Sequence, residues 1–292
     1  ELIITAPGLN ESIGGAILYD ETIRQQTKDG IPFIDVLIKA GIIPGIKVDT
    51  GAKPMAGFPN EKITEGLDGL RERLAEYKKM GARFAKWRAA ISIGNDIPTT
   101  GCIAANVHAL ARYAALCQEA GVVPIVEPEV LMEGDHSIQR CSEVTQHVLK
   151  ILFYQLYVYK INLEGMILKP NMIISGLGAV KRDSVDEVAE ATVNCLLKSV
   201  PAAMPTIAFL SGGQSPEEAS AHLNTINKNF KNHLPWIATF SFARAIQQPA
   251  LEIWKGKEAN VEEVQKLLDR RAKSDAASRH GEYIAALEYA LV

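Results

Sequence analysis

The chain has 292 residues, and its 31 Lys plus Arg against 34 Asp plus Glu give a formal net charge of −3 at neutral pH. Hydrophobic residues make up 47% and charged residues 22%, which excludes disorder over most of the chain because ample apolar surface offsets chain entropy. The near-neutral charge gives no electrostatic footprint for nucleic acid, and no apolar stretch is long enough to span a bilayer. We therefore expect a globular protein with no nucleic acid or membrane partner.

Residue types that commonly bind metals are scattered along the chain. The cysteines occur singly, with no CxxC pair: Cys102, Cys117, Cys141 and Cys195. The histidines fall on expected helices or loops, where we interpret them as surface or packing residues: His108, His136, His147, His222, His233 and His280. This pattern predicts neither a disulfide framework nor a metal site, and it favours a reducing compartment. With no charged-then-apolar leader at Glu1, it predicts a cytoplasmic protein.

Short β-rich runs recur, and most have a nearly unbroken apolar core, as strands buried on both faces of a parallel sheet do. In chain order they are Gly15–Glu21, Ile43–Asp49, Arg83–Arg88, Val123–Glu129, Met166–Met172, Ile207–Gly213 and Ile237–Ala243.

Helical patterns lie between these runs. Apolar residues at three- and four-residue spacing predict a helix over 67–77 that Gly81 ends, and a second helix over 102–120. Two Ser-x-x-Glu capping boxes, beginning at Ser184 and Ser215, start two more helices. Asn260 is the expected N-cap of a helix from Val261 to about Ala277.

Strand–helix alternation at a regular spacing predicts a (β/α)8 TIM barrel. Lys47, Lys86, Glu127 and Lys169 follow one another at intervals of 39, 41 and 42 residues. Only seven units are found, because too few residues precede Gly15, so the first βα unit is missing from the given chain. A doubly wound open sheet is the rival fold, weakened by the absence of a GxGxxG or GxxxxGK[ST] turn. We expect one domain over 1–292, with a loose or helical tail from about residue 278.

Charged residues cluster at the carboxyl ends of successive strands, where barrel enzymes have their active sites. Residues two apart on a strand share a face, so three pairs each point into one site. The pairs are Lys47 with Asp49, Lys86 with Arg88, and Glu127 with Glu129. Charges in a dry interior are costly unless they pair or serve chemistry. A polar plug of salt bridges is the alternative, but charge at four successive strand ends favours a reactive site.

Lys169 is the most informative of these residues. It follows Met166-Ile167-Leu168 and precedes Pro170, so its amine is expected among apolar groups and other cations. Both conditions favour the neutral amine, which can attack a carbonyl and form a Schiff base. An ion pair with Glu127 or Glu129 is compatible with that role. Glu127 is the expected proton shuttle. Glu129 is a further candidate catalytic residue, although a structural role suits it better than Glu127.

A turn of Ser211, Gly212 and Gly213 ends one strand and opens the next helix. Glycines let backbone N–H groups approach a ligand, and a helix N-terminus favours an anion. Together with Ser241 and Arg244, past the next strand, the turn predicts a phosphate site. Arg88 across the barrel mouth offers a second anion contact, which points to a bisphosphorylated substrate.

The runs GIKVD, FAKWR, VEPE, LKPNM, FLSGGQS and TFSFARAI, in this order and spacing, resemble class I fructose-bisphosphate aldolase, closest to its bacterial branch. The resemblance extends from about Ile4 to about Tyr283. It implies a TIM barrel, a homotetramer and a carbon–carbon lyase of glycolysis and gluconeogenesis that uses neither metal nor cofactor. The implied substrate is fructose 1,6-bisphosphate, cleaved to dihydroxyacetone phosphate and glyceraldehyde 3-phosphate.

The resemblance also implies roles for the catalytic side chains. Lys169 would form the iminium with the C2 ketone. Glu127 would transfer protons, and Lys86 would lower the pKa of the reactive lysine.

The phosphate contacts follow from the same resemblance. Ser211, Gly212 and Arg244 would hold the phosphate on the ketose side. Arg88 and Lys47 would meet the other end.

Two departures from the family pattern bear on activity. The family's first barrel strand, with its catalytic aspartate, has no counterpart, and we expect residues to be missing after Ile3. Ala243 stands where the family has a phosphate-contacting glycine. If the missing strand is genuine, the alternative is a catalytically impaired phosphosugar-binding or scaffold protein. A further reading makes Lys169 the anchor of pyridoxal phosphate.

Overall fold

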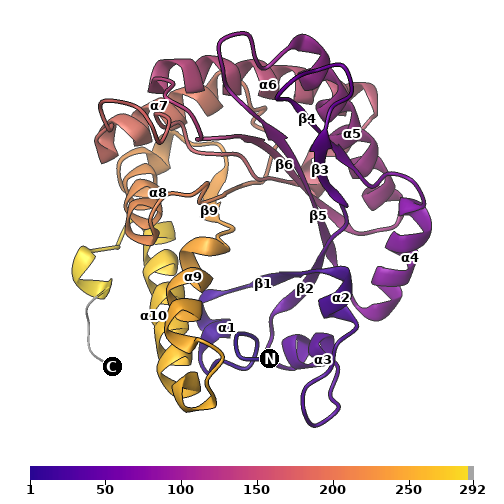
Figure 1. Ribbon diagram of the computed structural model, residues 1–292, viewed down its shortest axis with the longest axis vertical. Helices are drawn as coiled ribbons and strands as arrows, with labels where there is room; N and C mark the ends of the chain where they lie inside the picture. The colour runs from indigo at the N-terminus through magenta and orange to yellow at the C-terminus, as the bar shows by residue number, and fades with distance from the viewer. Residues whose placement is uncertain (289–292) are drawn as a thin grey trace.

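Seven parallel strands curl into one sheet with helices on its outer side, in the computed structural model that describes residues 1–288 (Figure 1). The sheet order is β1-β2-β5-β6-β7-β8-β9, so each strand pairs with the next unit along the chain. The strands are β1 Gly15–Leu18, β2 Ile43–Lys47, β5 Phe84–Ile91, β6 Val123–Val130, β7 Ile167–Leu168, β8 Thr206–Phe209 and β9 Ile237–Phe240. All seven predicted strands are confirmed, and the described residues contribute no eighth strand between β9 and β1.

Helices follow most of these strands and cover the sheet (Figure 1). They are α1 Leu9–Ser12, α2 Asp20–Ile23, α3 Phe33–Lys39, α4 Leu70–Met80, α5 Thr100–Glu119, α6 Ile138–Val158, α7 Val185–Leu197, α8 Pro216–Phe230, α9 Arg244–Trp254 and α10 Val261–His280. Both capping boxes are present: Ser184 and Glu187 bond reciprocally at the start of α7, and Ser215 and Glu218 at the start of α8.

The hydrophobic core lies between the sheet and these helices. The strands contribute fully buried side chains such as Ile46, Trp87 and Val126. Leu110 of α5 and Leu152 of α6 are equally buried on the helix side. Apolar packing on the outer face of the sheet therefore holds the strands in place. The carboxyl ends of the strands are not needed for this packing and can carry polar side chains.

A two-stranded hairpin between β2 and α4 was not predicted. Strands β3 Gly51–Pro54 and β4 Lys62–Glu65 pair antiparallel, and both are too short and polar to show an apolar alternation. Glu61 fastens the hairpin to α5, because its carboxylate accepts hydrogen bonds from the Thr99 amide at 2.7 Å and hydroxyl at 2.6 Å. The insertion places a polar hairpin beside the end of β2.

Several strand boundaries differ from the prediction. The strand expected over Met166–Met172 is only Ile167–Leu168, so Lys169 lies just beyond it, with its amide donating to the Val126 carbonyl at 2.8 Å. The following Pro170 has no N–H to continue the ladder, which explains the short strand. The strands expected to reach Gly213 and Ala243 end at Phe209 and Phe240, so both proposed phosphate segments are loops.

Asn260 is the N-cap residue of α10, as predicted, but its side chain makes no capping hydrogen bond there. Its backbone is helical, and its side-chain amide instead donates to the carbonyls of Ile253 at 2.8 Å and Trp254 at 3.3 Å. Asn260 therefore closes the end of α9 rather than the start of α10, since a short Glu258–Asn260 3-10 turn already leads into α10.

The expected tail from about residue 278 is partly ordered as helix. Helix α10 continues to His280, and a 3-10 turn covers Ala285–Glu288. The rest of the tail, residues 289–292, lies outside the described residues. Among the described helices, none has both the length and the apolar character needed to cross a membrane.

Candidate active site

A lysine–glutamate–lysine cluster lies at the carboxyl ends of three neighbouring strands. Glu127 of β6 forms two ion pairs: its Oε2 lies 3.0 Å from Lys86 Nζ of β5, and its Oε1 lies 3.1 Å from Nζ of Lys169, just after β7. All three side chains are at most 10% exposed. The parallel register brings the cluster together because Arg88 pairs with Glu127 and Val126 with Leu168 across the sheet. The predicted convergence of Lys86, Glu127 and Lys169 is therefore confirmed.

The electrostatics of the cluster lower the pKa of Lys169. Burial lowers the pKa of Lys169, Glu127 opposes that effect, and the positive charge of Lys86 adds to it, so the net shift is downward. Burial alone would raise the pKa of Glu127, but Lys169 and Lys86 hold it below its ordinary value. One carboxylate thus faces two amines, and the lowered pKa of Lys169 makes its amine a better nucleophile.

A second pair of charges borders the cluster at the strand ends. Arg88 of β5 donates from Nε to Glu129 of β6, and the arginine side chain remains 37% exposed. Burial would lower the pKa of Arg88, but Glu129 raises it overall, so the guanidinium stays charged. Glu129 was predicted as a catalytic residue; within residues 1–288 its ion-pair partner is Arg88, and Lys169 pairs with Glu127.

Lys47 and Asp49 form a tight pair at the end of β2. Lys47 Nζ donates to Asp49 Oδ1 at 2.5 Å and lies 5.5 Å from the centre of the Tyr19 ring. Asp49 also accepts from the amides of Gly51 at 3.1 Å and Arg88 at 3.2 Å. Its oxygens therefore fasten β2 to β5, and Lys47 is left at the border of the site.

The predicted phosphate turn follows β8. The Gln214 amide donates to the Ser211 carbonyl at 3.0 Å, which closes the turn, and both intervening glycines have positive φ, 62° at Gly212 and 93° at Gly213. A side chain at either position would be strained, which explains the two glycines. Within residues 1–288 neither glycine N–H has a hydrogen-bond acceptor. Two backbone donors are thus available to an anion.

Arg244 stands beside this turn at the start of α9. Its guanidinium lies about 4 Å from the position that a Cβ on Gly213 would take, and no carboxylate pairs with it in the described part of the chain. Ser241 lies just past β9, where its amide donates to the Phe209 carbonyl at 2.9 Å. The turn, Ser241 and Arg244 therefore come together as predicted.

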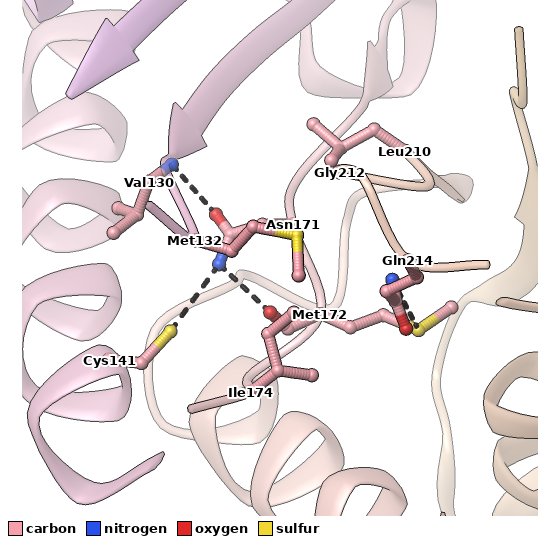
Figure 2. A pocket seen from close by; sticks show the side chains of 9 residues that line it. All are labelled: Val130, Met132, Cys141, Asn171, Met172, Ile174, Leu210, Gly212 and Gln214. Atoms are coloured by element: carbon pink, nitrogen blue, oxygen red, sulfur yellow. Dashed lines mark hydrogen bonds between the residues drawn. The ribbon is translucent and has the colours of Figure 1, made fainter. Parts of the chain in front are cut away.

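Sequence reasoning missed the polar residues that support these loops. Asn171 accepts from the Val130 amide at 3.0 Å and donates to the Met172 carbonyl at 3.1 Å, which fixes the chain after Lys169 against the end of β6. Figure 2 shows Asn171 in a small pocket with Gln214 and Gly212 nearby. The available signal was a buried-segment asparagine two residues after the lysine in LKPNM.

Side chains of the types that bind metals do not cluster in the described residues. Nowhere in 1–288 do three or more His, Cys, Asp or Glu side chains gather in a way that could hold a metal ion. The four cysteines are all buried free thiols, as their single occurrence predicts.

Known proteins share both the sequence and the architecture. The family model for class I fructose-bisphosphate aldolase matches residues 1–290. A probable fructose-bisphosphate aldolase class 1 of Xanthomonas campestris pv. campestris is 56% identical over 97% of this chain and 84% of its own length. The cytosolic fructose-bisphosphate aldolase 4 of Arabidopsis thaliana is 47% identical over 97% of this chain and 72% of its own.

The similarity extends to three dimensions. The fructose-bisphosphate aldolase of Plasmodium falciparum, solved with TRAP and a small-molecule inhibitor, superposes with a TM-score of 0.94 at 44% identity, covering 97% of this chain and 82% of that one. The fold is accordingly of the TIM-barrel type, with a curled seven-stranded parallel sheet. The chain belongs to the class I fructose-bisphosphate aldolase family and is therefore a lyase by class.

Proposed function

We propose that this protein cleaves fructose 1,6-bisphosphate through an imine formed on Lys169. The observation that carries the proposal is the burial of the Lys169 amine 3.1 Å from Glu127, which in turn contacts Lys86 at 3.0 Å. Family membership supports a sugar bisphosphate as the substrate.

The reaction begins when the neutral Lys169 amine adds to the C2 ketone and water leaves, giving an iminium. Glu127 then takes the proton of the C4 hydroxyl as the C3–C4 bond breaks, and the electron pair of that bond passes into the iminium to form an enamine. Glyceraldehyde 3-phosphate departs. Protonation of the enamine at C3 and hydrolysis then release dihydroxyacetone phosphate and restore Lys169.

Glu127 is the proposed proton-transfer group for imine formation and hydrolysis. Its two oxygens already face the two amines, so a proton can pass to or from Lys169 without a change of partner. The positive charge of Lys86, on the other side of Glu127, disfavours the protonated form of Lys169 and so lowers its pKa.

The two phosphates are proposed to bind at opposite sides of this cluster. Ser211, Gly212, Gly213, Ser241 and Arg244 would hold the ketose-side phosphate through backbone N–H groups and one guanidinium. Lys47 and Arg88 would meet the other phosphate, with Asp49 and Glu129 holding those cations in place.

Borohydride trapping tests the proposal directly. Reduction in the presence of fructose 1,6-bisphosphate should leave a stable adduct on the peptide that contains Lys169, detectable by mass spectrometry, and none without the sugar. Replacement of the exposed hairpin lysine, Lys53→Met, is the control that should retain the adduct. An adduct on a different lysine would refute the assignment.

A phosphosugar-binding or scaffold role is the second candidate, and it applies only if the missing first strand is genuine; residues 1–288 contribute seven strands to the sheet. The same experiment separates the two functions. Binding of the sugar bisphosphate with no trapped adduct would support the scaffold, whereas trapping at Lys169 would exclude it.

We also propose a single-domain subunit that acts in the cytoplasm as a homotetramer. Relatives from Arabidopsis thaliana and Cicer arietinum are named cytosolic and cytoplasmic, which supports the location. Exposed apolar side chains near the end of α6, Tyr154, Tyr157 and Val158, support self-association. Sedimentation equilibrium would measure the assembly state.

A further inference from the structure

Two buried polar side chains behind the Ser211–Gly213 turn have no role in the chemistry described so far. Gln214 follows the turn, and His222 lies two helical turns further along, on α8. Both side chains are buried, and His222 Nδ1 lies 2.6 Å from Gln214 Oε1. A buried glutamine and a buried histidine are costly unless their polar atoms are paired.

The hydrogen bonds of Gln214 fix the orientation of its amide. Its Nε2 donates to the Ser211 carbonyl at 2.9 Å and points its other hydrogen toward Met172 Sδ at 3.9 Å. Oε1 must then be the atom that faces His222, so the imidazole must donate from Nδ1. Burial lowers the pKa of His222 to about 4, so the ring is neutral with a single N–H at physiological pH.

This arrangement affects the proposed anion site because it fixes the orientation of the Ser211–Gly212 peptide unit. The Ser211 carbonyl accepts twice from Gln214, from its amide at 3.0 Å and its side chain at 2.9 Å. A trans peptide is planar, so its C=O and N–H point in opposite directions. Holding the Ser211 carbonyl toward α8 therefore aims the Gly212 N–H away from α8, where it has no acceptor within residues 1–288.

We infer that Gln214 and His222 are positioning residues that orient the Gly212 N–H for the phosphate of the substrate. The inference rests on the proposed function, because it assigns a role to residues behind the proposed phosphate turn. His222 acts at one remove: its N–H holds the Gln214 amide, which holds the Ser211 carbonyl. Neither side chain touches the substrate.

A pair of substitutions at His222 tests this chain of contacts. His222→Leu removes the donor at similar volume and should raise KM for fructose 1,6-bisphosphate and the inhibition constant of inorganic phosphate by about ten-fold, with kcat within about two-fold. His222→Asn offers a side-chain N–H near the position of Nδ1 and should restore both constants to near the wild-type values. Unchanged constants in His222→Leu would overturn the inference.

A matched variant on the same helix separates positioning from stability. Asn227 is also buried on α8, where it donates to the carbonyls of Leu223 and Ser278 at 3.2 Å and makes no contact with the turn. Asn227→Leu should lower the melting temperature but leave KM and phosphate inhibition unchanged. Equal changes in both variants would make His222 merely structural.

Calorimetric titration with inorganic phosphate keeps the test independent of turnover. If the wild type neither cleaves sugar nor traps an adduct, the proposed function fails, yet weaker phosphate binding in His222→Leu than in wild type would still support positioning. Equal phosphate affinity in the two proteins would overturn it.

Discussion

The molecule has two buried ion clusters, and the buried cations are lysines in one and an arginine in the other. At the strand ends, Glu127 joins the amines of Lys86 and Lys169. Behind the sheet, Arg271 of α10 pairs with Asp275 at 3.2 Å and with Glu288 of the final 3-10 turn.

The two clusters respond to burial in opposite ways. Burial lowers the pKa of Lys169, which can lose its proton, whereas Asp275 and Glu288 outweigh burial and raise the pKa of Arg271. In the second cluster burial acts on the acid instead and raises the pKa of Asp275 to about 7. A buried cluster whose cation can lose its proton, such as Lys169, is suited to catalysis. A buried cluster whose cation keeps its proton, such as Arg271, is suited to a structural role.

Removing the reactive amine is expected to have the largest effect. Lys169→Met should lower kcat for fructose 1,6-bisphosphate cleavage roughly 10⁴-fold or more, because it removes the amine proposed to form the imine. The fold should persist, since Glu127 keeps Lys86 as a partner. Steady-state kinetics and circular dichroism measure the two results; normal cleavage would refute the role of Lys169.

The corresponding substitution in the other cluster should affect stability instead. Arg271 also donates to the carbonyls of Ala245 and Pro216, so it links α8, α9 and α10. Arg271→Met leaves two buried carboxylates uncompensated and should cost about 3–5 kcal/mol of unfolding free energy. Urea denaturation measures that loss. If kcat fell while stability held, the contrast between the clusters would be wrong.

The protonation of Asp275 should make the stability of the second cluster depend on pH. Because its folded pKa of about 7 exceeds the ordinary value of 3.8, the folded state holds the proton more tightly, and stability falls as pH rises from about 4 through 7. Asp275→Asn removes the proton linkage and should be more stable than wild type at pH 8 by roughly 1–4 kcal/mol. Near pH 4 the two proteins should unfold alike. Melting curves of both proteins at pH 4 and pH 8 test this expectation. If Asp275→Asn were less stable than wild type at pH 8, the raised pKa of Asp275 would be contradicted.

Replacing Arg244, an exposed cation beside the proposed phosphate turn, should have the smallest effect of the four substitutions. Arg244→Ala should raise KM about ten-fold by removing a charge-assisted phosphate contact. The melting temperature should stay nearly constant, because Arg244 is exposed and no carboxylate pairs with it in the described residues. An unchanged KM would remove Arg244 from the phosphate site.

The strand-end charges could be predicted from the sequence because local rules fix them. Period-two alternation and parallel pairing were enough to bring Lys86, Glu127 and Lys169 into one site. The short, polar hairpin strands β3 and β4 carry no such pattern, and Glu61 holds them through contacts distant in sequence.

Side-chain partnerships across elements were also beyond sequence reasoning. Asn260 matches an N-cap by type and position, but the carbonyls at the end of α9 lie within its reach. His222 resembles any buried helix histidine until Gln214 is seen facing it. Tertiary geometry chooses among partners that are equivalent in sequence.

The two-to-one ratio of amines to carboxylate at Glu127 couples substrate capture to bond formation. When Lys169 is neutral, the formal charges of Lys86 and Glu127 cancel within this cluster. In the proposed reaction, conversion of the amine to an iminium then creates a positive charge between the two phosphates of the substrate. Each phosphate therefore favours the covalent step as well as the encounter, and a ketose without phosphates should be both weakly held and slow to condense.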